Sequence, residues 1–330
     1  MTGQHVHVES GLTGAGAAAL KADDHRIVVI GAGGWLGLAT LELLHRLLGA
    51  RAFAARVVAI GSSERVLNLR AGLTVAQRPL RVLSHLPRAP SWVLHLAFLT
   101  QEKAKAMSDD DYVAANRVIS GQVLHALDRI GADGVFVPSS GAVYKVDDPE
   151  APASMRLYGR LKLEDEAAFG DWAEARGKRA VIARVFNLSG PYINKQSSYA
   201  LACFIKDALA GRPIEIKAAW PVYRSYLAIS ELMSVAFGVL TDGGRGSVLF
   251  DAAGDREYEM GEIAATVAAV LVAKQGPRRQ MMTAQNQDRY IGDNATFTGL
   301  RRRFAVDPVD FSSQIITTGR FIEDVSGAPA

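Results

Sequence analysis

Short apolar runs alternate with longer stretches of helical character along most of the chain. Arg26–Ile30 is a β-branched run that ends in glycines, and the Leu-rich segment Leu36–Leu48 follows it. Strand-like runs then recur, each followed by a helix-like segment: Arg56–Ile60, Trp92–Ala97, Gly134–Pro138, Ala180–Val185, Ser225–Ile229 and Val248–Asp251. Strands that alternate with helices predict an α/β fold with a doubly wound, mostly parallel sheet covered on both faces.

The later part of the chain has a different pattern. Ala202–Leu209 and Met260–Val272 are expected to be helices, separated by Gly- and Pro-marked loops. We therefore expect residues 25–190 to form the main domain and residues 191–330 mainly a smaller lobe. The two parts should be interleaved, because the strands near 225–229 and 248–251 are expected to return to the main sheet.

Composition narrows the functional classes. The chain has 330 residues, 49% hydrophobic and 22% charged, with a formal net charge of +3. This balance gives no strong attraction to nucleic acid or to an anionic membrane, and no apolar run is long enough to span a bilayer. The single cysteine, Cys203, precludes an internal disulfide and fits a reducing, cytoplasmic compartment. No Cys and His cluster has metal-ligand spacing, so no metal site is expected.

The first residues differ from the rest of the chain. Residues 1–24 are rich in Gly, Ala, Thr and His. They lack the basic start and the long apolar core of a secretory signal. We expect a frayed, disordered tail here.

A glycine-rich stretch lies between the first strand and the first helix. Residues 31–37 read Gly-Ala-Gly-Gly-Trp-Leu-Gly. Glycines at this spacing permit a tight turn, close approach of a pyrophosphate and close helix–strand packing, and the helix N-terminus offers free N–H groups. The alternative is a simple tight turn, but the strand–glycine–helix context favours a Rossmann-type dinucleotide site. The expected cofactor contacts are Gly31, Gly33, Gly34, Trp35, Leu36 and Gly37.

The residues after the second strand bear on the choice between NAD and NADP. NAD sites usually place an acidic side chain at the end of this strand to bind the ribose hydroxyls. Here residues 61–65 read Gly-Ser-Ser-Glu-Arg. Two hydroxyls and a guanidinium suit a 2′-phosphate, so we expect Ser62, Ser63 and Arg65 to bind NADP. NAD is the alternative if Glu64 binds the ribose instead.

A tyrosine and a lysine lie four residues apart in a helix-like segment. Tyr158 and Lys162 should share one helical face. A neighbouring cation would lower the pKa of the phenol, so that Tyr158 can exchange a proton with a substrate oxygen. The run Val135–Pro138 should deliver Ser140 to the carboxyl edge of the sheet, where its hydroxyl can hold that oxygen. The alternative is an exposed helix with solvated side chains.

In this order, the motifs resemble the extended short-chain dehydrogenase/reductases, the branch that acts on nucleotide-linked sugars. The similarity covers roughly residues 26–310 and rests on Gly31–Gly37, His95–Phe98, Asn116, Ser139–Tyr144, Tyr158–Lys162, Arg184–Pro191, Arg224–Tyr226 and Asp293–Pro308. The resemblance implies a nicotinamide-dependent oxidoreductase or epimerase with a nucleotide-sugar substrate.

The resemblance also implies a role for each matching residue. Tyr158 would be the acid–base residue, Lys162 its partner and a ribose ligand, and Ser140 would orient the sugar oxygen. Further cofactor contacts would be Leu96, Ala97, Phe98, Asn116, Tyr158, Lys162 and Val185. Substrate contacts would be Ser140, Gly141, Asn187 and Arg224.

Two positions after the catalytic serine narrow the reaction. In the family that this chain resembles, dehydratases carry an Asp-Glu pair at these two positions. Decarboxylases similarly carry a glutamate there, and enzymes that epimerise two carbons carry a cysteine. Gly141 and Ala142 can move no proton. The remaining reactions are keto reduction and 4-epimerisation with tightly held NAD, and the segment 61–65 favours an NADPH-dependent reductase. A non-catalytic dinucleotide sensor is a third reading, although such proteins usually lose the Tyr or the Lys.

The family resemblance further implies a homodimer. Its interface would involve the helices near Asp111–Arg129 and Leu157–Ala175. The apolar spacing of Val118, Leu124 and Leu127 permits this, although the same side chains could instead face the sheet.

Overall fold

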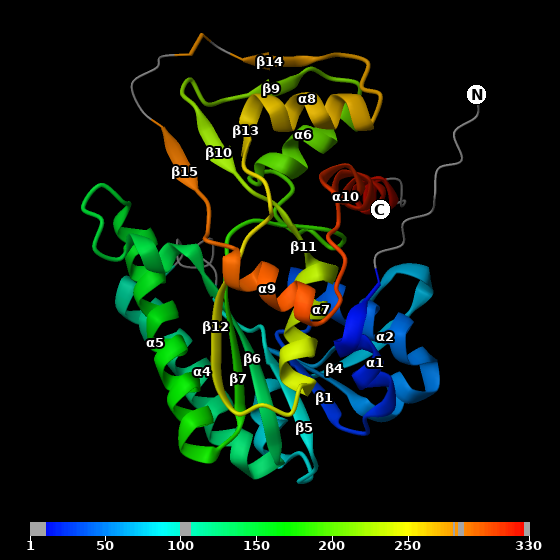
Figure 1. Cartoon of the computed structure of the whole chain (residues 1–330), viewed down its shortest axis with the longest axis vertical. Coiled ribbons are helices and arrows are strands. Elements are labelled where there is room, and N and C mark those ends of the chain that lie inside the picture. Colours follow the sequence, from blue (N-terminus) through cyan, green and yellow to red (C-terminus); the bar gives the residue numbers. More distant parts are fainter. Residues whose placement is uncertain (1–10, 100–106, 280, 283–286, 327–330) are drawn as a thin grey trace.

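An eight-stranded sheet forms the centre of the molecule, and a smaller lobe lies above its carboxyl edge (Figure 1). The computed structural model describes residues 11–99, 107–279, 281–282 and 287–326. The strands of the sheet are β1 (Arg26–Ile30), β2 (Val57–Gly61), β3 (Arg65–Asn68), β4 (Thr74–Pro79), β5 (Ser91–His95), β6 (Ala132–Ser140), β7 (Arg179–Val185) and β12 (Gly246–Ala252). The predicted α/β class is confirmed.

The order of the strands places the site. It is β12-β7-β6-β5-β1-β2-β4-β3, and only the β3–β4 pair is antiparallel. From β1 the chain winds outward first toward β2 and β4 and then, after β5, in the opposite direction. Such a reversal opens a crevice at the carboxyl ends of β1 and β5, and α/β sheets bind ligands there.

Two layers of helices cover the sheet. On one face lie α1 (Gly14–Ala22), α2 (Trp35–Arg56) and α7 (Ile229–Thr241), and on the other lie α4 (Asp109–Ile130) and α5 (Ala153–Arg176) (Figure 1). The ends of α4 follow from its sequence. Ser108 caps its first turn by accepting a hydrogen bond from the Asp111 backbone N–H, and Gly131 ends it in the left-handed conformation at φ +79°.

Among the described residues, the smaller lobe contains three helices and short strands. Its helices are α6 (Ala200–Leu209), α8 (Met260–Val270) and α10 (Phe311–Ser326). Its strands form one sheet of β13 (Tyr258–Glu259), β10 (Val222–Arg224) and β15 (Asp288–Tyr290), and a pair of β14 (Pro277–Arg279) and β9 (Ile214–Ile216). Short α9 (Ala295–Arg303) leads back toward the main sheet (Figure 1).

Two expectations from the sequence are wrong. Residues 11–24 are not a frayed tail: α1 buries Ala17 and Leu20 against α7, because small residues permit close packing, and a Cβ on Gly16 would lie 2.4 Å from the Gly238 nitrogen. Residues 1–10 lie outside the described part. The strand expected at 225–229 does not join the main sheet, because β11 (Leu227–Ala228) pairs with β8 (Leu188–Ser189). The strand at 248–251 does return, as β12 beside β7.

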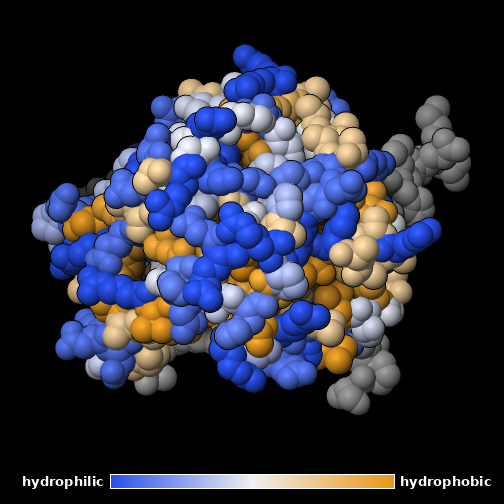
Figure 2. Space-filling view, turned by 90° about the horizontal axis from the view of Figure 1, so that it is seen from below, coloured by the Kyte–Doolittle hydropathy of each residue, from blue (hydrophilic) through white to orange (hydrophobic). Residues whose placement is uncertain are grey.

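Seen from below, hydrophilic and hydrophobic side chains are interspersed over the face at the amino ends of the strands (Figure 2). Within the described residues, no helix is both long and apolar enough to cross a membrane.

Candidate active site

The glycine loop after β1 has the geometry of a phosphate cradle. Gly31 adopts φ +86°, and a Cβ on it would lie 2.6 Å from the Ala97 nitrogen, so only glycine fits against the strand end at Leu96–Ala97. A Cβ on Gly37 would lie 2.3 Å from the Gly31 carbonyl oxygen, which shows how closely α2 approaches the loop. Helix α2 begins at Trp35, so its first N–H groups face the loop.

At the other end of this crevice, β2 ends beside an exposed cation. Ser62, Ser63 and Arg65 are all exposed after Gly61. The Arg65 guanidinium lies over the glycine loop, where its Nη2 is 3.5 Å from the Gly33 carbonyl oxygen and would be 1.9 Å from a Cβ on Gly33. The structure thus brings the two predicted phosphate-binding segments together.

These features fit a dinucleotide. The glycines keep side chains of the loop itself out of the cradle, and the loop faces a helix N-terminus. A buried amide oxygen of Gln77 beside the loop has no hydrogen-bond partner among the described residues. The residues that would hold the pyrophosphate are Gly33, Gly34 and the first turn of α2, where Trp35 and Leu36 lie.

Helix α5 brings Tyr158 to the end of β6. A Cβ on Gly159 would lie 2.3 Å from the Ala142 carbonyl oxygen, so the glycine that follows the tyrosine lets α5 pack directly on the 141–145 turn. Ser140, the last residue of β6, is buried next to this contact. The nearby Ser140 hydroxyl lowers the pKa of the Tyr158 phenol, so the structure brings the predicted serine and tyrosine together.

The pKa of Tyr158 departs from the prediction. We expected the Lys162 charge to lower it, but burial raises it well above the usual value, the negative charge that Tyr290 can carry adds to this, and the Ser140 hydroxyl opposes it. Lys162 lies on the same helical face, with its Nζ 6.0 Å from the centre of the Tyr158 ring. The expectation failed because desolvation outweighs a cation at that distance.

Lys162 itself is enclosed. Its Nζ donates a hydrogen bond to the Pro138 carbonyl oxygen at 3.0 Å and lies 3.7 Å from the centre of the Phe98 ring. Burial lowers its pKa to about 8, and the nearby Asp165 and Glu166 charges oppose this shift. The closest Asp165 oxygen is 4.0 Å away. At neutral pH, Lys162 is therefore mostly a charged ammonium, and the buried Asp165 carboxyl group lies beside it.

The loop after β5 forms the wall beside Lys162. Asn116 on α4 is buried and accepts a hydrogen bond from the Leu99 N–H at 2.8 Å, while its Nδ2 donates to the Tyr112 carbonyl oxygen. The contribution of Asn116 to the site is thus to fix the loop that carries Leu96, Ala97 and Phe98. His95, at the end of β5, is buried beneath this loop, and burial lowers its pKa to about 3, with the Lys162 charge contributing.

The predicted substrate residues gather on the lobe side of Ser140. Gly141 lies against the Phe186 ring, and Val185 precedes that ring at the end of β7. Asn187 is buried, and its Nδ2 has no partner among the described residues, so it is a free donor. Arg224 is less free, because its Nη2 forms an ion pair with Asp288 at 2.6 Å.

Sequence reasoning missed Tyr290. This residue ends β15, and its hydroxyl lies 3.1 Å from the Ser140 Oγ. Its ring packs on Phe186 at 4.9 Å between centres. A lone tyrosine 150 residues from the serine gave no signal, since only the pairing of β15 with β10 brings it to the site.

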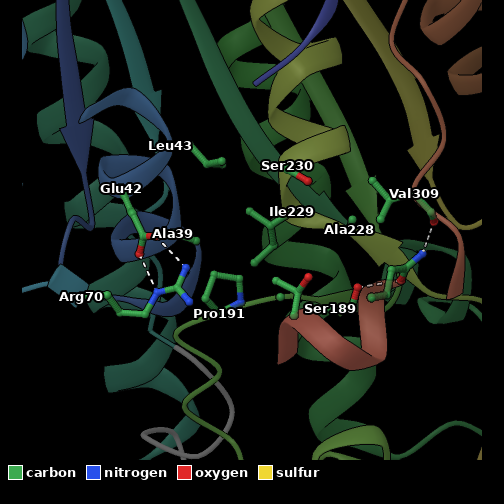
Figure 3. Close-up of a pocket in the computed structure, with 13 residues that line it drawn as sticks. Ala39, Glu42, Leu43, Arg70, Ser189, Pro191, Ala228, Ile229, Ser230 and Val309 are labelled. Atoms are coloured by element: carbon green, nitrogen blue, oxygen red, sulfur yellow. Dashed lines mark hydrogen bonds and ion pairs between the residues drawn. The ribbon is translucent and has the colours of Figure 1, made fainter. Parts of the chain in front are cut away.

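The cavity drawn in Figure 3 does not belong to this site. It is lined by Glu42, Arg70, Ser189, Ile229 and other residues of α2, α7 and α10, with Glu42 and Arg70 joined by an ion pair (Figure 3). Its free volume of about 20 Å³ accommodates one water molecule rather than a sugar.

Comparisons with known proteins show the family of this chain. Residues 27–249 match the model of the NAD dependent epimerase/dehydratase family. GDP-6-deoxy-D-mannose reductase of Pseudomonas aeruginosa is 27% identical over 221 residues, which cover 62% of this chain and 72% of that protein.

Solved structures agree with the fold. The UDP-N-acetylglucosamine 4-epimerase of Methanobrevibacter ruminantium, solved with UDP-N-acetylmuramic acid, superposes with a TM-score of 0.73 at 18% identity, covering 92% of this chain and 99% of the other. The UDP-glucose 4-epimerase of Thermus thermophilus, solved with NAD, gives 0.65 at 19% identity, covering 92% and 100%.

Proposed function

The chain belongs to the NAD-dependent epimerase/dehydratase family, and from this premise we propose that it reduces a keto group of a nucleotide-linked sugar with NADPH. The observation that carries the proposal is the end of β2, where Gly61 replaces an acidic residue and Arg65 lies over the glycine loop. A guanidinium there suits a 2′-phosphate, and a missing carboxylate removes the usual NAD contact. A GDP-sugar reductase among the relatives supports the same reaction.

Tyr158 would serve either candidate reaction. A ketone that accepts a hydride becomes an alkoxide and needs a proton, which Tyr158 would supply as an acid. Oxidation, the first half of an epimerase cycle, needs the same phenol as a base.

Each remaining residue has a stated task in this proposal. Bound NADPH supplies the hydride. The Ser140 hydroxyl donates a hydrogen bond to the sugar oxygen and stabilises the charge that grows there. Tyr158 transfers its proton to that oxygen, and the Lys162 ammonium supplies the positive charge beside the phenol and binds the nicotinamide ribose. The free Asn187 Nδ2 and Arg224 bind the diphosphate.

A nucleotide-sugar 4-epimerase with tightly bound NAD is the second candidate. Gly141 and Ala142 carry no carboxylate, so Ser140, Tyr158 and Lys162 would suffice for either reaction. Copurified NAD that resists exchange is expected only for the epimerase.

The first test assays both candidate reactions, the reductase reaction being followed in its oxidative direction. Purified protein is mixed with NADP and GDP-6-deoxy-D-mannose, and NADPH formation is followed by absorbance, with Tyr158→Phe as the inactive control. Parallel samples contain UDP-glucose with NAD, and the sugars are separated by chromatography. NADPH formation that Tyr158→Phe abolishes supports the reductase. Interconversion of UDP-sugars without net cofactor reduction would replace it by the epimerase.

We also propose that the chain forms a homodimer through α4 and α5. Val118 on α4 is 57% exposed, and a pocket of about 170 Å³ lies between the two helices. Sedimentation should give a dimer for the native protein and a monomer for Val118→Glu. A monomeric native protein would contradict the proposal.

A further inference from the structure

A buried glutamine occupies the place of the missing acidic residue at the end of β2. Gln77 lies on β4, which pairs with β2 so that Ala59 is opposite Gln77 and Gly61 is opposite Pro79. Its side chain reaches across to Gly61, where a Cβ would lie 2.3 Å from the Gln77 Cδ and 2.4 Å from both its Nε2 and its Oε1. A side chain at position 61 is thus excluded, and the Gln77 amide fills its space.

The orientation of the Gln77 amide is defined by its hydrogen bond. Gln77 is 2% exposed, and its Nε2 donates a hydrogen bond to the Ser63 carbonyl oxygen at 2.7 Å. A carbonyl can only accept, so the nitrogen must face Ser63, and the free end must be Oε1. This oxygen is buried and has no partner among the described residues. Buried acceptors are seldom left unpaired, so Oε1 is a candidate ligand atom.

The free oxygen points toward the glycine loop. A Cβ on Gly33 would lie 2.9 Å from Oε1 and 1.9 Å from the Arg65 Nη2. Oε1 and the guanidinium therefore converge on one point between the end of β2 and the loop. The adenosine ribose of a dinucleotide lies there in a Rossmann-type site.

We propose that Gln77 binds the adenosine ribose and makes the site tolerant of a 2′-phosphate. Its Oε1 accepts a hydrogen bond from the ribose 3′-hydroxyl, which NAD and NADP share. A carboxylate at this point would repel a 2′-phosphate, whereas the neutral amide does not, and Arg65 binds the phosphate from the other side. The inference rests on the proposed nicotinamide cofactor but concerns recognition alone, not the sugar or the reaction.

The test is direct binding. Gln77→Glu keeps the shape and adds a charge, and the dissociation constants of NADPH and NADH are measured by calorimetry at neutral pH. We expect the ratio of the Kd for NADPH to the Kd for NADH to rise at least about tenfold, since the glutamate charge would repel the 2′-phosphate in a partly buried site. Gln275→Glu, on the exposed surface of the lobe, is the matched control and should leave the ratio unchanged.

A second variant covers the case in which a buried glutamate unfolds the protein. Gln77→Met removes the acceptor without adding charge and should weaken both cofactors by a similar factor of about five, the worth of one neutral hydrogen bond. Circular dichroism checks the fold of each variant.

The outcomes separate the two proposals. If the native protein binds NADPH and neither Gln77 variant changes an affinity as expected, the role of Gln77 is refuted and the proposed function stands. If the native protein prefers NADH and Gln77→Glu still raises the ratio, Gln77 reads the ribose and the NADPH assignment is wrong. If the native protein binds neither cofactor, both proposals fall.

Discussion

Replacing Asp165 by asparagine should lower the pKa of Lys162. Both side chains are buried on α5, and the Lys162 Nζ lies 4.0 Å from the Asp165 Oδ2. Burial already lowers the lysine pKa to about 8, and the Asp165 charge is the largest influence that opposes it. The variant removes this charge and leaves a neutral amide of the same shape.

The magnitude follows from the distance. Two unit charges 4.0 Å apart interact by about 4 kcal/mol at an effective dielectric constant of about 20. At about 1.4 kcal/mol per unit, this corresponds to a ceiling of about 3 pKa units. Burial also raises the pKa of Asp165, and the pair interacts below this ceiling wherever solvent screens it, so we expect the Lys162 pKa to fall by at least about one unit.

The assay observes the lysine directly. Protein labelled with ¹³C at the lysine Cε is titrated by NMR, and Lys162→Arg identifies the resonance. Glu164→Gln is the matched control, because Glu164 lies next to Asp165 in sequence but pairs at 2.8 Å with Arg117 on the surface. In the reductase assay, the alkaline limb of kcat/KM should move to lower pH with the Lys162 pKa. An unchanged Lys162 pKa in Asp165→Asn would refute Asp165 as its counter-charge.

Three further predictions concern other parts of the chain. Leu20→Ala should lower the free energy of unfolding by about 2–5 kcal/mol, measured by denaturant titration, because Leu20 is fully buried. Lys21→Ala, on the exposed side of α1, should change it little. Equally small effects of both variants would mean that α1 does not stabilise the fold. Because the pKa of His95 falls from 6.5 unfolded to about 3 folded, the native state binds fewer protons, and stability decreases as pH falls through that window. Between pH 7 and pH 5, the free energy of unfolding of His95→Gln should therefore fall by about 2 kcal/mol less than that of the native protein. The surface variant His85→Gln should lose as much stability as the native protein. Tyr290→Phe frees the Ser140 hydroxyl and should lower KM about fivefold at nearly constant kcat; a higher KM would show that Tyr290 binds substrate.

Local patterns in the sequence determined the class of the fold and indicated the candidate catalytic residues. Alternating strands and helices follow from short-range periodicity, and the glycine loop and the Tyr158–Lys162 spacing each lie within a few residues of chain. The structure brings both motifs to the carboxyl edge of a parallel sheet, as those patterns indicated. The absence of a carboxylate at Gly141 and Ala142 was also visible in the sequence, and it reduced the number of reactions to be considered.

Contacts between distant segments could only be decided by the tertiary structure. Gln77 meets Gly61 because β2 and β4 pair in one register, and Tyr290 meets Ser140 because the lobe folds back over the end of β6. The burial of α1 depends on the fit of Gly16 against α7. The small residues of α1 show no hydrophobic periodicity that would predict this contact. The pKa of Tyr158 likewise rises because burial outweighs Lys162, and the extent of burial is fixed only when the whole chain has packed.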